Sequence, residues 1–190
     1  APHCPKQIPI PQYIKLYNEY FGGGMNAIVF QEMREARGLA YSASGRLLEP
    51  EYKDDSYKYF AFIATQNDKM QTAIEAFDEI INDMPESETA FNIAKEALTT
   101  RCRTERITGR NILNSYRTAR QQGVTEPRTK KVYEKLPELT LEDVKNTQKK
   151  WVEGRTYSYG ILGDIENLDT EYLKTLGKVE ILTLEDIFGY

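Results

Sequence analysis

At 190 residues, the chain is long enough to bury a hydrophobic core without disulfides or a structural metal. Its formal net charge of -4 argues against a nucleic-acid-binding surface. No apolar run approaches the roughly 20 residues that a membrane span needs. The composition therefore predicts a soluble globular protein whose partner is neither a nucleic acid nor a membrane.

Residues 1–11 form a proline-rich lead-in. The chain starts at Ala1 without an initiator Met, and it has neither the basic nor the apolar region of a signal peptide. Such a start is typical of an interdomain segment exposed by cutting. We therefore expect residues 1–190 to be a single domain taken from a longer protein.

Two cysteines do not make a disulfide framework. Cys4 lies in the lead-in, and Cys102 lies on a predicted amphipathic helix, where buried free thiols are common. Neither residue indicates a compartment or a role.

Hydrophobic periodicity defines the secondary structure in chain order. Its clearest helix spans residues 68–84, where Met70, Ile74 and Phe77 share one stripe, and Pro85 ends it. Strands are indicated where apolar and polar residues alternate. The sequence predicts helices over 12–21, 25–36, 68–84, 87–105, 110–122 and 127–136, and strands over 39–48, 57–65, 156–162 and 179–182.

This order groups the helices and leaves neighbouring strands without a crossover. It predicts an α+β fold, in which an antiparallel or mixed β-sheet carries helices on one face. The interior shows no linker, so the chain is expected to form one domain.

The string LTLED occurs twice, over residues 139–143 and 182–186. Each copy places an acidic residue three positions after a Thr, which suits a helix N-terminus. We interpret the repeat as capping and not as a duplication.

A glycine run, Gly22, Gly23 and Gly24, precedes the helix expected over 25–36. Gly38 follows at a C-cap position, and the strand expected over 39–48 begins there. Arg34 and Tyr41 are thereby held seven positions apart around a tight corner. This corner is the candidate functional site.

The residues for independent catalysis are missing. The one histidine, His3, lies in the lead-in, so the chain has no Ser–His or Cys–His pair and no set of zinc ligands. The glycine run lacks the Lys-Ser/Thr of a phosphate-binding loop. We therefore expect no metal or other cofactor in this chain and no activity of the chain alone.

Arg34 and Tyr41 allow two interpretations. In the structural one, Arg34 caps helix carbonyls and Tyr41 packs in the core. In the functional one, a guanidinium and a phenol form a donor pair for a peptide carbonyl or a developing oxyanion. The residues alone leave both open.

The stretch over residues 20–42, with its glycines followed by FQEMREARGLAYS, resembles the pitrilysin/insulinase family of zinc metallopeptidases, the inverzincins marked by HxxEH. The ending GILGD over 160–164 and the final FGY are similar to the carboxyl end of long bacterial members. The resemblance implies a C-terminal, non-metal domain of a multidomain peptidase and, with it, a periplasmic or cell-envelope location.

By this resemblance, the zinc belongs to an HxxEH-bearing half, in the same polypeptide or in a partner subunit, and the two halves enclose a peptide chamber. Arg34 would bind substrate backbone carbonyls, and Tyr41 would orient the scissile peptide and stabilise the tetrahedral intermediate. Gly22, Gly23, Gly24 and Gly38 would support this corner structurally.

Two other functions stay open. The chain could be a catalytically inactive structural or assembly subunit of the same family, or a generic peptide-binding module. The sequence does not indicate the peptide substrate or the oligomeric state.

Overall fold

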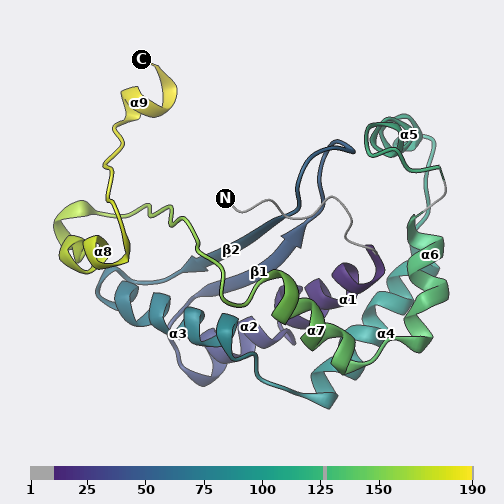
Figure 1. The fold of residues 1–190 in the computed structure, drawn as a ribbon, viewed down its shortest axis with the longest axis horizontal. Helices are drawn as coiled ribbons and strands as arrows, with labels where there is room; N and C mark the ends of the chain where they lie inside the picture. The colour runs from purple at the N-terminus through teal and green to yellow at the C-terminus, as the bar shows by residue number, and fades with distance from the viewer. Residues whose placement is uncertain (1–10, 126–127, 190) are drawn as a thin grey trace.

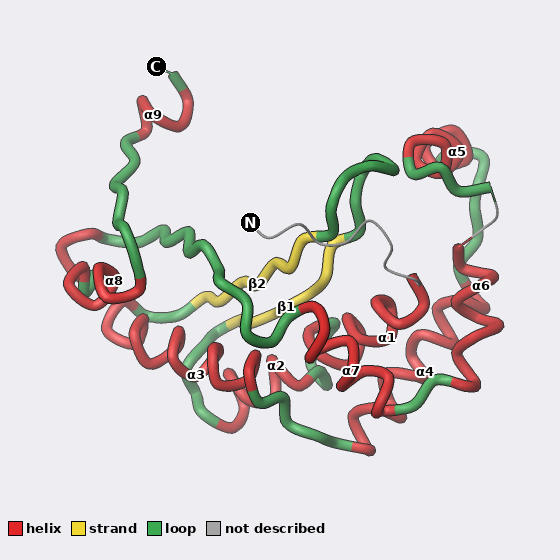
Figure 2. The backbone as a smooth tube through the Cα atoms, in the orientation of Figure 1, coloured by secondary structure: helices red, strands yellow, loops and turns green. Residues whose placement is uncertain are grey.

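The computed structural model describes residues 11–125 and 128–189. His3, Cys4 and three prolines of the lead-in, Pro2, Pro5 and Pro9, lie outside these residues, whereas Pro11 begins α1. Helices gather on one side of a two-stranded sheet (Figures 1 and 2). The elements are α1 (Pro11–Gly22), α2 (Ile28–Phe30), η1 (Gln31–Ala36), β1 (Ser42–Leu48), β2 (Lys58–Ala64), η2 (Asn67–Lys69), α3 (Met70–Asn82), α4 (Glu88–Thr104), α5 (Ile112–Gln121), α6 (Arg128–Lys135), η3 (Leu136–Glu138), α7 (Leu141–Trp151), η4 (Ile165–Asn167), α8 (Thr170–Leu176) and α9 (Leu184–Phe188).

Helix α1 is the centre of the core, although its sequence periodicity is weak. Tyr17, Tyr20 and Phe21 are fully buried, and the ring of Tyr17 stacks on that of Phe21 with 5.3 Å between centroids. The Tyr17 hydroxyl donates to Gln148 Oε1 of α7 over 2.6 Å, and Tyr20 donates to the carbonyl of Pro85 over 2.9 Å. Aromatic side chains with satisfied hydroxyls therefore join α1 to α7 and to the residues before α4.

The sheet is an antiparallel hairpin in which Gly45 pairs with Ala61. Ala43 and Leu47 of β1 are buried toward the helices. Phe60 and Phe62 of β2, on the alternate positions, are each 48% exposed. Period-two alternation thus gives one covered and one open face. The predicted α+β class, with helices on one face of an antiparallel sheet, is confirmed.

Helix starts follow the predicted caps. The Ser87 side chain accepts from the amide of Ala90 at the start of α4. Both LTLED copies form a full capping box, Thr140 with Asp143 at α7 and Thr183 with Asp186 at α9. The interpretation of the repeat as a capping signal is confirmed.

The strands expected over 156–162 and 179–182 are wrong, because neither segment has strand structure. Side chains, not a backbone ladder, anchor the first segment. The ring of Tyr157 lies 5.6 Å from that of Tyr59, and its hydroxyl donates to the carbonyl of Val152. Tyr159 donates to the Asp78 carboxylate of α3. Alternation indicates two faces but does not guarantee a neighbouring strand.

Within the described residues, no helix is long and apolar enough to cross a membrane.

Candidate functional site: the corner between α1 and β1

The first glycine of the run lies against the sheet. A Cβ atom on Gly22 would be 2.1 Å from the carbonyl oxygen of Gly45 and 2.4 Å from its amide nitrogen. A Cβ on Gly23 would be 2.8 Å from the Asn18 carbonyl oxygen, whereas one on Gly24 would meet nothing within 4 Å. Close backbone approach between α1 and β1 therefore requires glycine at position 22.

The helix of the corner differs from the expected α-helix over 25–36. It starts at Ile28 and changes after Phe30 into a π-helix, η1. The Arg37 amide donates to the carbonyl of Glu32, five residues earlier, over 3.1 Å. Short π-helical segments occur often at functional sites. The apolar spacing, with Val29 and Met33 both buried, fits either helix type, so the sequence carries no signal for the difference.

Gly38 ends this helix, as its C-cap position predicts. Its φ is 59°, and its amide donates to the carbonyl of Arg34 over 3.2 Å. The chain then enters the sheet, where the Tyr41 amide donates to the carbonyl of Ala64 over 2.7 Å. The Thr65 hydroxyl donates to the carbonyl of Leu39 over 2.6 Å. Hydrogen bonds to the backbone thus fix both sides of the corner.

The structure brings Arg34 and Tyr41 together. The guanidinium carbon of Arg34 lies 5.4 Å from the centroid of the Tyr41 ring and 5.0 Å from that of Phe30. Tyr41 is 80% exposed, so the interpretation that it packs in the core is wrong. The Arg34 side chain is 43% exposed. The pair is therefore a preformed surface feature held by cation–π contacts.

Arg34 has no strong partner within the described part of the chain. Its Nε lies 3.7 Å from a Glu35 carboxylate oxygen, and no hydrogen bond from its side chain to a helix carbonyl is found there. The structural interpretation of Arg34 as a carbonyl cap is therefore not supported. A guanidinium has five N–H donors in a planar fork, so donors of Arg34 remain for a ligand.

The second arginine of the helix has a structural role. Arg37 Nη1 lies 2.8 Å and Nη2 lies 3.2 Å from the two carboxylate oxygens of Glu79 on α3. These hydrogen bonds raise the pKa of Arg37 and lower the pKa of Glu79. Arg37 ties the corner to α3, while Arg34, three residues earlier, faces solvent.

Sequence reasoning missed Phe30 as part of the site. The signal was present, because Phe30 precedes Arg34 by four residues and such pairs meet on a helix surface. Phe30 is half-buried, so its ring is a firm support for the guanidinium.

No cluster of three or more His, Cys, Asp or Glu side chains that could hold a metal occurs within residues 11–125 and 128–189. Cys102 on α4 is a half-buried free thiol, and burial raises its pKa. A raised pKa leaves less of the nucleophilic thiolate, so this residue is no candidate nucleophile.

Residues 6–98, which include the whole corner, match the family model of the peptidase M16 inactive domain. The matched region is just under half of the chain, and it is similar to a peptidase M16 inactive domain. The crystal structure of a peptidase M16 inactive domain from Pseudomonas fluorescens is similar to this chain, with a TM-score of 0.58 and 19% sequence identity. At this identity the likeness shows a common fold.

That alignment covers 77% of this chain and 35% of the other, so this chain spans about a third of the length of the structure it matches. A search of curated protein sequences finds no match. The resemblance to the pitrilysin/insulinase family, peptidase family M16, that the corner predicts is thus confirmed.

Proposed function

We propose that this M16 inactive domain completes the peptide chamber of a zinc-dependent endopeptidase and supplies Arg34 and Tyr41 for substrate binding. The observation that carries the proposal is the exposed, preformed Arg34–Tyr41 pair within the region that matches the family. A structural arginine would be expected to be paired, as Arg37 is.

The two side chains suit different moments of peptide hydrolysis. The Arg34 guanidinium can donate charge-assisted hydrogen bonds to substrate backbone carbonyls, which fix the register of an extended peptide. The exposed Tyr41 hydroxyl can donate to the oxygen on which negative charge develops in the tetrahedral intermediate. Phe30 and the backbone bonds of Tyr41 and Gly38 hold both groups in place before substrate arrives.

The described residues do not fit a zinc site. In this proposal the metal belongs to an HxxEH-bearing half of the same polypeptide or of a partner subunit. A zinc ion there would activate a water for attack on the peptide. This chain would bind and orient the substrate.

Complementation tests the arrangement. Zinc content and peptide cleavage are measured for this chain, for the HxxEH-bearing half and for their mixture. We expect stoichiometric zinc in the HxxEH half and cleavage only in the mixture. Tight stoichiometric zinc in this chain, together with cleavage by it alone, would overturn the proposal.

A structural subunit of the same family is the second candidate, and it too is consistent with the lack of a metal cluster in the described residues. In that case complementation would not depend on Arg34 or Tyr41. A simple peptide-binding module would instead bind peptides without the other half.

A further inference from the structure

Helix α5 is amphipathic, but its apolar side chains face solvent. Ser115, Ala119 and Gln121 are its half-buried residues, whereas Ile112, Leu113 and Tyr116 are exposed, Leu113 by 78%. A helix on a globular protein ordinarily turns its apolar stripe toward the core. An apolar stripe that faces solvent is typical of a binding surface.

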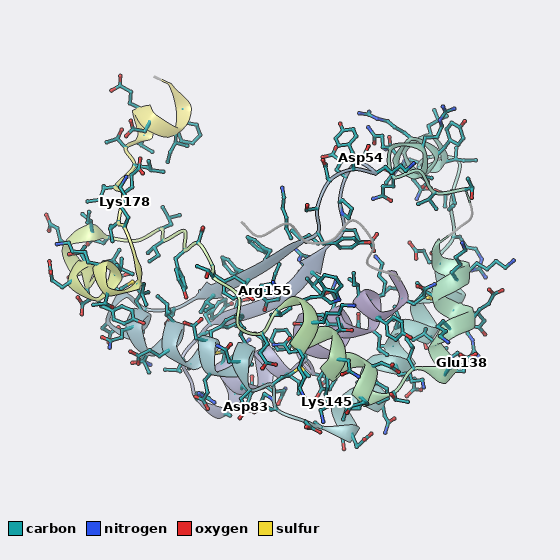
Figure 3. The ribbon with its side chains drawn as sticks, viewed as in Figure 1. Asp54, Asp83, Glu138, Lys145, Arg155 and Lys178 are labelled. Atoms are coloured by element: carbon teal, nitrogen blue, oxygen red, sulfur yellow. The ribbon has the colours of Figure 1, made fainter. Side chains whose placement is uncertain are left out.

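The orientation of α5 is fixed by the loop between β1 and β2. The Lys53 amide donates to the carbonyl of Gln121 over 2.9 Å, and Gln122 Nε2 donates to the carbonyl of Pro50 over 2.9 Å. Figure 3 shows Asp54 of this loop next to α5. The apolar stripe therefore has a fixed support.

The segment that carries this stripe is basic, although the supporting loop carries the exposed acids Glu51, Asp54 and Asp55. Residues 106–125 contain four arginines and no Asp, Glu or Lys. Arg120 lies over the Tyr116 ring at 6.0 Å and donates to its hydroxyl over 3.3 Å. Arg117 is exposed next to them. The partner of α5 should therefore be apolar and acidic.

Residues 179–188 of the same chain have this chemistry. They contain three acidic residues, Glu180, Glu185 and Asp186, and no basic residue. Leu184 is 72% exposed, and four other apolar side chains of this segment are exposed as well. They are Ile181, Leu182, Ile187 and Phe188. The capping box of Thr183 and Asp186 gives α9 a defined helical shape.

In Figure 1, α9 and α5 lie at opposite ends of the molecule and project from the same side. A two-fold axis between two copies would place each α9 opposite the other copy's α5. The same contact would then form twice, as in a closed isologous dimer. We propose that two copies of this chain associate in this way, with residues 179–188 of each covering the apolar, basic face of the other's α5.

Sedimentation equilibrium of the chain at low and moderate ionic strength tests the dimer. Reversing two charges on α5, by Arg117→Glu with Arg120→Glu, should weaken dimerisation at least about tenfold. Glu180→Arg with Glu185→Arg should weaken it similarly, while Asp186 is left to cap α9. Combining all four changes should restore association toward the wild-type value.

Lys58→Glu with Lys149→Glu is the matched control. Both side chains are exposed and lie outside the two segments. This variant changes the net charge as much as the α5 variant does, and we expect it to dimerise like wild type. Thermal unfolding of each variant verifies that the fold is intact.

A chain that stays monomeric up to about 100 µM, where even the weaker specific interfaces are detected, would overturn the proposal. So would a dimer that the four-charge exchange fails to restore. Binding of the monomer to anionic phospholipid vesicles through α5, without self-association, would assign the surface to a membrane and also overturn it.

Discussion

The corner over residues 20–48 and the segment over residues 155–189 have apolar patterns of similar clarity, but only the corner is buried against the rest of the domain. In the corner, the Gly22 backbone lies against Gly45, and the Tyr41 amide donates to the carbonyl of Ala64. The later segment is attached mainly by Tyr157 and Tyr159, and its apolar residues are largely exposed. The pattern alone does not decide burial; an available partner surface does.

Substitutions at the glycine run should show this contrast most strongly. Gly22→Ala places a Cβ against the Gly45 backbone, which cannot move without distorting the sheet, so we expect a loss of about 3 kcal/mol in the free energy of unfolding. Gly24→Ala is the control, because its Cβ meets nothing within 4 Å. It should not lower stability. Urea unfolding measures both, and equal stability of the two variants would contradict the account.

Loss of the hydrogen bond between α1 and α7 should give the next largest decrease in stability. Tyr17→Phe removes the donor to Gln148 Oε1 and leaves that buried amide oxygen without it, at a cost of about 1–3 kcal/mol. Tyr13→Phe on the same helix should change stability little, because no hydrogen bond of its hydroxyl is found in the described part of the chain. Denaturant midpoints compare the two, and a neutral Tyr17→Phe would show that this bond is dispensable.

The two capping boxes form an internal control within one chain. Thr140→Ala should cost about 1 kcal/mol, because α7 buries Leu141 and Val144 in the core. Thr183→Ala removes the same bonds from the exposed α9 and should leave the thermal midpoint unchanged. Equal effects would mean that residues 179–188 are part of the cooperative core, contrary to their exposure.

Substitution of Asp78 should change stability least, and the change should depend on pH. Burial raises its pKa, so the native state binds this proton more readily than the unfolded chain does. The stabilisation that protonated Asp78 gives the native state is fully present below the pKa that Asp78 has in the unfolded chain. It is lost as pH rises through the pKa that Asp78 has in the folded protein. Asp78→Asn should therefore gain stability relative to wild type between about pH 3 and pH 6.

The gain should stay below about 1 kcal/mol, because solvent screens this partly exposed carboxylate. Stability curves of both proteins at several pH values measure it. A relative gain that grows toward low pH would reverse the sign and contradict the assignment.

Much of the fold follows from local signals in the sequence. The end of a helix at Gly38, the hairpin, the Ser87 cap and the two capping boxes all depend on a few neighbouring residues, and all are present. The strands expected over 156–162 and 179–182 failed because strand formation needs a neighbouring strand, which local alternation cannot report.

The site was predictable in part. The spacing of Arg34 and Tyr41 across Gly38 brings them together as expected. The π-helix was not predictable, because Val29 and Met33 satisfy the apolar spacing of either helix type. Which arginine is paired was also hidden, since the partner of Arg37 is Glu79, 42 residues away.

The most direct test of the central claim separates Arg34 from Arg37 in the complemented peptidase. For Arg34→Ala we predict a loss of about 10²-fold or more in kcat/KM for peptide cleavage with unchanged stability, and for Tyr41→Phe a loss mainly in kcat. Arg37→Ala should instead lower stability by up to about 1 kcal/mol and keep its activity. Full activity of Arg34→Ala and Tyr41→Phe in a folded complex would contradict the account and favour a purely structural domain.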